Sequence, residues 1–372
     1  MLRYLHALLR PRVYVEVGIR GYVASSLAQS HTSVVKLEKL AGLAAHQDQV
    51  DLVLFSAGAK WPLLSEMTGS DSSDGVSVCY GDPGEVMKSV AGYSQAGYSP
   101  KPHVVVAKDG WVAVARGGSR GTLSASAVDD AYRANVESRG GMDAELSALQ
   151  EYVMTSHSAA ATPGVSQLNA ATLHGVERCP CEVAVLLPAI DLPLARKTAV
   201  LLRERAGMPC QIYIVHDEQR NGLVSTVNKA YQAIQAPFYA FVAQDVFAGQ
   251  DWLSIAHECL QNERTGLFGF NDGRLGGSHA SFGLVRRTWA ESIYGRHLFF
   301  PGYQTHACDT ELTLVAKQQQ AYSSDPAAIL LEVDYFKDYA TSSYPDVRLY
   351  RERKRKGFGG LVSDQALLEA YA

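Results

Sequence analysis

The stretch Phe238-Tyr-Ala-Phe-Val-Ala-Gln-Asp245 places an apolar run directly before a glutamine and an acidic residue. The earlier stretch Cys210-Gln-Ile-Tyr-Ile-Val-His-Asp217 has a similar form. Short apolar runs of this kind are typical of buried strands in a parallel sheet. The C-terminal ends of parallel strands share one edge, where open α/β sheets bind their ligands. We therefore expect Asp217 and Asp245 to line one cleft, and a carboxylate there is suited to hold a divalent cation.

Strands and helices alternate on both sides of these runs. The segment Val183-Ala-Val-Leu-Leu-Pro188 predicts a buried strand, and the spacing of apolar residues predicts helices over 194–206 and 224–235. Strands that alternate with helices of this length predict an α/β fold with a parallel sheet.

Length and composition limit the class of protein. The chain has 372 residues, of which 47% are hydrophobic and 19% charged, as in a globular protein of two domains. The net charge of −4 gives no overall signature of nucleic-acid binding. We find no apolar run of the ~18 residues that a membrane span needs. The opening segment, residues 1–10, is too short and too polar at its end for a signal peptide.

Six cysteines are scattered along the chain without the spacing of a disulfide framework, which favours a reducing compartment. Cys179 and Cys181 form a C-x-C pair, but no second pair stands at zinc-site spacing. A place in a linker is therefore favoured over a metal role for this pair. We expect a cytoplasmic protein.

The N-terminal part predicts a smaller domain with short strands at residues 13–17, 34–38 and 50–55. His103-Val-Val-Val-Ala and Trp111-Val-Ala-Val-Ala flank an Asp-Gly turn, which predicts a β-hairpin. Residues 120–155 follow the hairpin and complete this part of the chain. Residues 156–181, with a run of alanines and Thr-Pro-Gly, are expected to form a linker.

The segment Glu16-Val-Gly18-Ile-Arg-Gly21 resembles the cofactor loop of class I methyltransferases, in which a strand ends in a glycine turn against S-adenosylmethionine. Glu38 would then reach the ribose of that cofactor. Only twelve residues separate Glu38 from Asp51, too few for the usual intervening helix and strand. We therefore expect a degenerate Rossmann-like domain that is structural or binds an acceptor, over one that transfers methyl groups.

Residues 183 to about 338 resemble the GT-A glycosyltransferase superfamily, especially its family-2-like bacterial and phage members. The resemblance rests on segments in the family's order: Ala184-Val-Leu-Leu-Pro188, Val215-His-Asp217-Glu-Gln-Arg-Asn221-Gly222 with Val227-Asn228, Ala243-Gln-Asp245-Val with Trp252-Leu253, Gly276-Gly-Ser-His279-Ala-Ser-Phe-Gly283, and Cys308-Asp309-Thr-Glu311. It implies metal-dependent, inverting transfer of a sugar from a nucleoside diphosphate to a hydroxyl. The acceptor would be a glycan, a protein or a modified DNA base, in a bacterial or phage-infected cell.

The resemblance also implies a binding site for the donor. The carboxylate of Asp217 would meet the nucleoside, Asn221 and Gly222 would form the turn beside it, and Asn228 would face the same group. The nucleotide-sugar-binding residues expected on this basis are Pro188, Asp217, Asn221, Asn228, Gln244, Asp245, Gly277 and His279. His279 would touch sugar or phosphate, or simply satisfy its own loop, and Asp272 is a weaker candidate of the same sort.

Asp245 falls at the last position of the family's D-x-D motif, which ligates Mn²⁺ or Mg²⁺. The cation neutralises the leaving diphosphate. Ala243 replaces the first Asp, so the ribose contact of that residue is absent. A helix cap or turn is the alternative role for Asp245. Many relatives carry a metal-binding His after the last strand, but residues 328–338 contain no His here. Either Glu332 or Asp334 would replace it, or the metal would be held more weakly.

Asp309 and Glu311 form a second pair of carboxylates. An inverting transfer needs a base that takes the proton from the acceptor hydroxyl, and the resemblance implies that one of the two is this base. Asp309 is the first choice. In the alternative interpretation, Asp309 caps a helix and Glu311 complements its dipole.

The expected fold is α/β: a C-terminal GT-A (Rossmann-like nucleotide-sugar-binding) domain preceded by a smaller Rossmann-like α/β domain. The expected divisions are 1–155, the linker 156–181, the glycosyltransferase domain 182–345 and a basic tail 346–372. The tail is expected to be a solvated helix face, or to grip phosphates. A nucleotide-sugar-binding scaffold with a decayed active site, and a bifunctional methyltransferase–glycosyltransferase, are the competing hypotheses.

Overall fold

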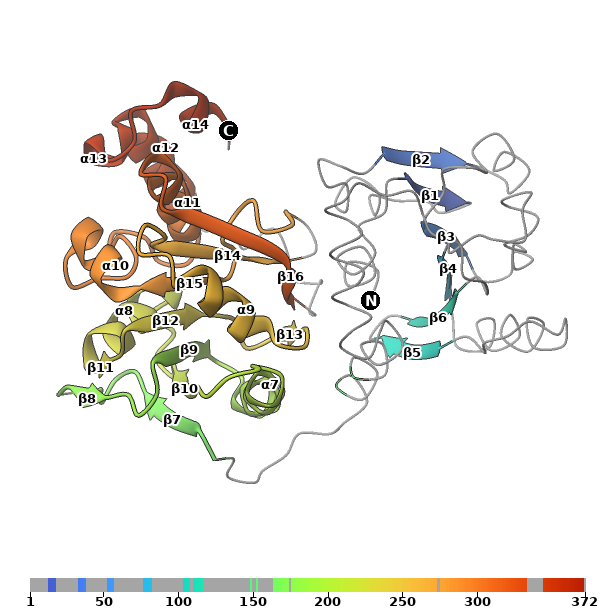
Figure 1. The fold of residues 1–372 in the computed structure, drawn as a ribbon, viewed down its shortest axis with the longest axis horizontal. Helices are drawn as coiled ribbons and strands as arrows, with labels where there is room; N and C mark the ends of the chain where they lie inside the picture. Colours follow the sequence, from blue (N-terminus) through green and yellow to red (C-terminus); the bar gives the residue numbers. More distant parts are fainter. Residues whose placement is uncertain are drawn as a thin grey trace, which may run out of the picture. The chain divides into compact units, whose positions relative to one another are not determined.

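The computed structural model describes residues 163–173, 175–272, 275–332 and 344–370, positions 148 and 152, and the backbone of six strands nearer the N-terminus. The chain divides into two compact units, Met1–Thr155 and Ser156–Ala372 (Figure 1).

The described part of the first unit is a six-stranded sheet in the order β2-β1-β3-β4-β6-β5. β1 is parallel to β2 and β3, β3 is parallel to β4, and β6 is antiparallel to β4 and β5. The predicted hairpin is confirmed as β5 and β6, whereas β4 was not predicted. Gly18, Gly21 and Glu38, on which the methyltransferase resemblance rests, lie outside the described residues. The strands are β1 (Val13–Val17), β2 (Ser33–Leu37), β3 (Leu52–Ser56), β4 (Val76–Gly81), β5 (His103–Ala107) and β6 (Gly110–Arg116).

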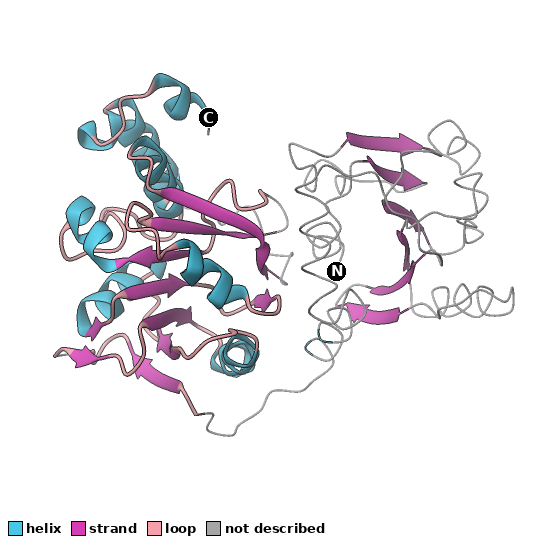
Figure 2. Cartoon of the chain, viewed as in Figure 1, coloured by secondary structure: helices cyan, strands magenta, loops and turns pink. Residues whose placement is uncertain are grey.

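The second unit is built on an eight-stranded sheet in the order β13-β16-β14-β15-β12-β9-β10-β7 (Figures 1 and 2). The predicted α/β alternation is confirmed, since β9, β10 and β12 are parallel and the chain runs through a helix between successive strands. The strands of this sheet are β7 (Val165–Asn169), β9 (Val183–Ala189), β10 (Gln211–His216), β12 (Phe238–Phe241), β13 (Val246–Ala248), β14 (Leu267–Asn271), β15 (Gly283–Arg286) and β16 (Tyr322–Glu332). A two-stranded sheet pairs β8 (Glu177–Arg178) with β11 (Ile234–Gln235).

Helices cover both faces of the large sheet. α7 and α9 pack on one face, and α8, α10 and α11 pack on the other (Figure 1). The helices are α7 (Leu192–Glu204), α8 (Leu223–Ala233), α9 (Trp252–Cys259), α10 (Arg287–Tyr294), α11 (Cys308–Gln318), α12 (Tyr344–Arg355), α13 (Gly357–Gly360) and α14 (Gln365–Ala370).

Successive side chains of the continuous apolar strands enter the two cores alternately. In β9, Val183 and Val185 point into the core under α7, while Ala184 and Leu186 point into the core under α8. Successive side chains of a strand lie on opposite faces, so a strand covered on both faces has to be apolar at every position. The continuous apolar run of residues 183–188, which predicted a buried strand, is therefore the mark of a strand covered on both faces.

The segment 156–181, predicted as a linker, differs from that expectation because it supplies two strands. β7 pairs in parallel with β10 at the outer edge of the large sheet. Four of its five side chains are only half-buried and one is exposed. An edge strand of this kind lacks the apolar run that identifies β9, which is why the sequence did not reveal it.

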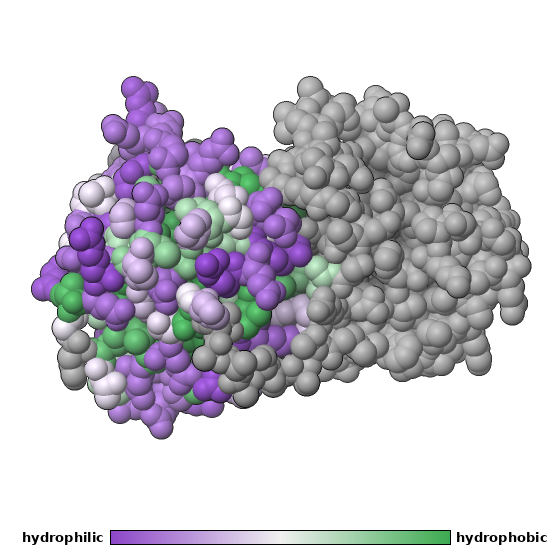
Figure 3. All heavy atoms as spheres, turned by 60° about the horizontal axis from the view of Figure 1, so that its bottom comes forward, coloured by the Kyte–Doolittle hydropathy of each residue, from purple (hydrophilic) through white to green (hydrophobic). Residues whose placement is uncertain are grey.

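The basic segment 346–372 also differs from a tail, because α12, α13 and α14 belong to the second unit. Phe358 is buried beside Leu314 and Val315 of α11. In the part of the chain that the structure describes, no helix combines the length and the apolar character needed to cross a membrane. On the face that Figure 3 shows, the surface of the described residues is mainly hydrophilic, with smaller apolar areas between.

Candidate functional site

One edge of the large sheet gathers the acidic residues that follow its strands. β7, β9, β10 and β12 run parallel, β15 runs antiparallel between β12 and β14, and β16 is parallel to β14. The C-terminal ends of all these strands except β15 therefore lie at one edge. Asp217 follows β10, Asp272 follows β14, and Asp245 precedes β13, whose first residue pairs with the last residue of β16. This edge is where an open α/β sheet binds ligands.

The carboxylate of Asp217 shapes the loop that leads into α8. It accepts hydrogen bonds from the backbone N–H groups of Asn221 and Gly222, both at 2.9 Å, and from the side-chain amide of Asn221 at 3.3 Å. Gly222 has a φ of 98°, and a Cβ there would lie 2.7 Å from the carbonyl oxygen of Gln304. Asp217 is buried while Asn221 is exposed, so the loop offers its amide side chain to the solvent at the sheet edge.

Gln244 joins the ends of β9 and β12. Its side-chain oxygen accepts the backbone N–H groups of Ile190 and Asp191, both at 2.9 Å, and its carbonyl oxygen accepts the Thr198 hydroxyl at 2.6 Å. Pro188 is half-buried in β9, opposite Val215. Ile190 is 54% exposed at this edge. An exposed isoleucine beside polar strand ends is an apolar surface that the sequence pattern did not single out.

Asp245 is buried, with 3% of its surface exposed, directly before β13. Val246, the residue after Asp245, pairs with Glu332 across strands β13 and β16. The backbone of Glu332 therefore lies one residue further along the strand pair than Asp245. The side chain of Glu332 and the whole of Asp334 lie outside the described residues. Ala243 is partly buried and packs against the core. Among the described side chains, no group of three or more His, Cys, Asp and Glu is arranged to hold a metal ion.

The side chain of Asn228 is held in the interior. Its carbonyl oxygen accepts the N–H groups of Leu298 and Phe299, both at 3.0 Å, and its amide donates to the carbonyl oxygen of Phe299 at 3.0 Å. The residue is buried in α8. Its contacts fix the 298–299 loop, and its assignment to the nucleoside stays a prediction.

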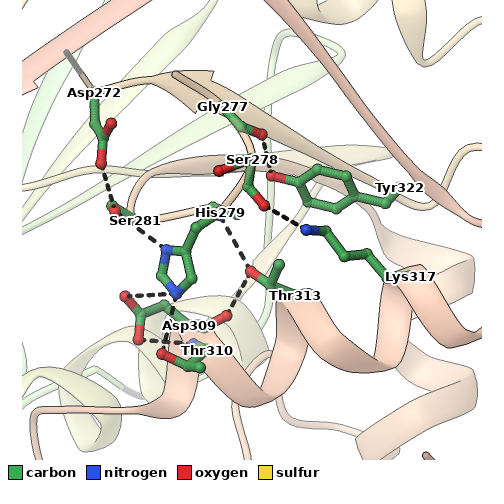
Figure 4. Close-up of polar contacts among 11 residues, drawn as sticks. Asp272, Gly277, Ser278, His279, Ser281, Asp309, Thr310, Thr313, Lys317 and Tyr322 are labelled. Carbon is green, nitrogen blue, oxygen red and sulfur yellow. Dashed lines mark hydrogen bonds and ion pairs between the residues drawn. The ribbon is translucent and has the colours of Figure 1, made fainter. Parts of the chain in front are cut away.

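The first turn of α11 carries Asp309 beside His279. The ring Nε2 of His279 lies 3.0 Å from the Thr310 hydroxyl and 4.0 Å from Oδ2 of Asp309 (Figure 4). The ring Nδ1 lies 3.2 Å from the Ser281 hydroxyl, which donates to Asp272 at 2.9 Å. His279 is 6% exposed, whereas the side chain of Asp309 is 30% exposed. A chain of polar groups thus connects a solvent-accessible carboxylate with a second carboxylate at the sheet edge.

The loop that carries His279 is anchored from α11 and β16. The Lys317 ammonium donates to the carbonyl oxygen of Ser278 and the Tyr322 hydroxyl to that of Gly277, both at 2.6 Å (Figure 4). Gly277 has a φ of 82°, and a Cβ there would lie 2.9 Å from Cβ of Ser324. Only glycine fits this conformation and this space. Gly277 therefore supports the His279 loop by close packing.

Glu311 occupies a different environment, with no exposed surface. Arg353 of α12 donates hydrogen bonds to both carboxylate oxygens of Glu311, at 2.6 and 2.8 Å. The hydroxyls of Tyr294 and Tyr303 also donate to this carboxylate, at 2.8 Å each. Burial and then the Glu311 carboxylate raise the pKa of both phenols well above the usual range, so they remain donors. The guanidinium also lies over the ring of Phe300. The geometry of Glu311 is that of a structural ion pair.

The start of α11 differs from the expectation that Asp309 caps it. Ala307, with a φ of 66°, holds the cap position without a side-chain hydrogen bond, and the helix begins at Cys308. Asp309 lies inside the first turn, where its Oδ1 accepts the N–H of Thr310 at 2.8 Å. The helix starts one residue before Asp309 because the preceding loop is fixed by other groups. One oxygen of the Asp309 carboxylate is thus used inside the first turn, while Oδ2 faces His279.

That loop is fixed by α12. The buried carboxylate of Asp346 accepts three backbone N–H groups, from Gln304, Thr305 and His306, at 2.8 to 2.9 Å. The carbonyl oxygen of Gln304 in turn accepts the N–H of Val224 at the start of α8. The C-terminal helices thus hold the segment that leads into α11. Sequence reasoning missed Asp346, Ser281 and Thr310, which carry no motif of their own.

No protein-family model matches the chain, and no curated protein matches it. Among solved structures, one match is the mannosyltransferase PcManGT from Pyrobaculum calidifontis in complex with GDP-Man and Mn²⁺. The identity is 14% and the TM-score 0.37, over 48% of this chain and 64% of that one. The chain thus spans less than two thirds of that structure.

Proposed function

We propose that the chain is a glycosyltransferase that moves a sugar from a nucleoside-diphosphate sugar to a hydroxyl acceptor. The observation that carries the proposal is the gathering of Asp217, Asp245 and Asp272 at one sheet edge, with Asp309 linked to Asp272 through Ser281 and His279. A transfer of this type needs a place for the nucleotide, charge compensation for the diphosphate and a base for the acceptor. The same edge offers residues for all three.

The nucleoside is assigned to the ends of β9 and β10. Asn221 offers an exposed amide, and Asp217 holds its loop in shape. Ile190, exposed beside Gln244, offers an apolar surface for the face of a base. A few polar groups beside an apolar wall are the usual composition of a small-molecule site.

Asp245 is the proposed ligand of Mn²⁺ or Mg²⁺. It is an oxygen donor, as these hard cations prefer, and the strand pairing of Val246 brings the backbone of Glu332 next to it. When bound, the cation supplies charge compensation for the leaving diphosphate. A second ligand would come from the end of β16 or the segment after it.

Asp309 is the proposed base, in preference to Glu311. A base has to reach the acceptor hydroxyl, and Asp309 is partly exposed whereas Glu311 has no exposed surface and is bound by Arg353. In the inverting reaction, the acceptor oxygen bonds to the anomeric carbon while the bond to the phosphate oxygen breaks. The acceptor proton moves to Asp309, and the electron pair leaves with the diphosphate.

The first test is a thermal-shift screen of the full chain with UDP, GDP, TDP, CDP and S-adenosylmethionine, each with and without Mn²⁺. A ligand at 100 times its Kd stabilises the folded state by about 2.7 kcal/mol. We expect one diphosphate to shift the melting temperature in a Mn²⁺-dependent way, and Asp245→Ala to remove that dependence. Silence with all four diphosphates would contradict the proposal. A shift with S-adenosylmethionine alone would favour methyl transfer by the first unit.

A decayed nucleotide-sugar-binding scaffold is the second candidate. Ala243 in the core position and the absence of a metal cluster among the described side chains favour it. Both candidates predict nucleotide binding. They differ in turnover: incubation of the identified donor with Mn²⁺ and an acceptor panel releases the nucleoside diphosphate only from an enzyme, and Asp309→Asn abolishes that release.

A further inference from the structure

The polar chain behind Asp309 has a fixed direction. An ionised carboxylate only accepts hydrogen bonds, so the Ser281 hydroxyl gives its one proton to Asp272. The Ser281 oxygen is then left to accept from Nδ1–H of His279. This sets the tautomer of the neutral imidazole. Its Nε2 lone pair faces Thr310 and the carboxylate of Asp309 (Figure 4).

We propose that His279 is a positioning residue that takes from Asp309 the proton of the acceptor hydroxyl, held in the correct tautomer by Ser281 and Asp272. This inference rests on the proposed function. Asp309 first removes the proton as the acceptor oxygen bonds to the anomeric carbon. The proton then passes from the Asp309 carboxyl to Nε2 of His279, which leaves Asp309 as a carboxylate and His279 as an imidazolium. The imidazolium returns the proton to solvent when the product leaves.

The distances fit a relay that completes when substrate binds. Nε2 and Oδ2 of Asp309 are 4.0 Å apart, and catalytic hydrogen bonds are often long without substrate and tighten in the complex. The Asp309 carboxylate is partly exposed, so its side chain has room to turn toward the ring. The Thr310 hydroxyl, at 3.0 Å from Nε2, holds the ring in place meanwhile.

Carboxylates approach the ring from two sides. Asp309 faces it from α11, and Asp272 reaches it through Ser281. Lys317, a cation of α11, donates to the carbonyl oxygen of Ser278, next to His279 in the chain. Two nearby carboxylates stabilise an imidazolium. With little of the ring exposed, solvent screens these interactions only weakly.

The contacts of the ring make Nε2 the atom that has to change partner. Both ring nitrogens lie within hydrogen-bonding distance of hydroxyl groups of the protein, on Ser281 and Thr310. A hydrogen bond from the ring to the donor would require one of these contacts to break. Uptake of the proton from Asp309 requires the Thr310 hydroxyl to release Nε2, and it keeps the contact of Nδ1 with Ser281 in place.

The kinetic test compares His279→Gln with the matched variant His257→Gln. His257 lies on α9, beside Glu182 and Gln261. Loss of the relay should lower kcat by roughly tenfold or more. This decrease should be smaller than the about 10²–10⁴-fold decrease expected when the base itself is lost. KM for the donor should stay the same, and the acid limb of the kcat–pH profile should move. His257→Gln should leave kcat and the profile unchanged.

Chemical rescue and NMR complete the test. Imidazole added to His279→Ala should restore part of kcat, and no such rescue is expected for Asp309→Asn. In full-length protein with ¹⁵N-labelled histidine, the signals missing from His279→Gln identify the ring. We expect the Nδ1–H tautomer.

The outcomes separate this inference from the proposed function. Sugar transfer by the wild type together with an unchanged kcat and pH profile in His279→Gln would overturn the relay alone. An Nε2–H tautomer would overturn it as well, whatever the kinetics. A rise in donor KM without a change in kcat would make His279 a sugar-binding residue instead. Absence of any transfer by the wild type would overturn both proposals.

Discussion

Two carboxylates two residues apart in the first turn of α11 have opposite environments. Asp309 is partly exposed and faces His279, whereas Glu311 is fully buried between Arg353, Tyr294 and Tyr303. At 3.6 residues per turn, positions i and i+2 point to nearly opposite sides of a helix. The same turn therefore presents one acid to the candidate site and uses the other to attach α12.

This difference separates chemistry from stability on a single helix. A carboxylate that serves as a base has to remain accessible, while a buried one is tolerated only when paired and hydrogen-bonded. Glu311 has four donors from three side chains, which leaves no oxygen for a substrate. Changes on the two sides of α11 should therefore have different consequences.

The largest effect is expected from Asp309→Asn. The amide keeps the shape of the side chain but cannot take a proton, so kcat should fall by about 10²–10⁴-fold. The melting temperature should change little, because the side chain of Asp309 is 30% exposed and the amide oxygen of Asn can still accept the N–H of Thr310. Initial rates of nucleoside diphosphate release measure the first, and a thermal melt the second. Glu291→Gln, a change in an exposed carboxylate of α10, is the control, and a similar loss there would refute the assignment.

Arg353→Ala tests the other side of the helix. It leaves the Glu311 carboxylate buried without its cation, and breaking such a pair costs about 3–5 kcal/mol. The midpoint of urea unfolding, followed by tryptophan fluorescence, should fall accordingly. If stability is unchanged, the pair does not attach α12 as the structure indicates.

The apolar strands and the hairpin of the N-terminal unit could be predicted from the sequence, because their patterns arise from burial and from turn geometry alone. The edge strand β7 could not, since its side chains are half-buried or exposed and carry no apolar run. A strand at the edge of a sheet is covered less than one at its centre. Its pairing with β10 is a long-range property that no local pattern records.

The candidate site divides in the same way. Asp217, Gln244 and Asp245 stand directly after apolar runs, and the sheet places all three at its edge. Asp309 and Glu311 could not be told apart from the sequence, because the difference lies in Arg353, which is 42 residues from Glu311. Asp346 acts through three backbone N–H groups that lie 40 to 42 residues earlier in the chain. Ser281 acts through His279 and Asp272, and short polar side chains such as serine are common in loops.

Gly277→Ala should have an intermediate effect. The φ of 82° and the 2.9 Å approach of a new Cβ to Ser324 should cost about 1–3 kcal/mol. The change should also lower kcat, since the loop carries His279. Gly295→Ala is the matched control, because its φ is 63° but no atom lies within 4 Å of the new Cβ. It should destabilise less and leave kcat unchanged; equal effects would mean that backbone strain alone accounts for Gly277.

Arg351→Ala should have the smallest effect. Arg351 is exposed on α12, two residues from Arg353, and carries the same charge. Exposed charges contribute little to stability because water and salt screen them. The urea midpoint and kcat should match those of the wild type, and the difference from Arg353→Ala should persist at high salt, since a buried pair is screened much less. A loss of activity in Arg351→Ala with unchanged stability would instead show that the basic face of α12 binds a phosphate of the donor or acceptor.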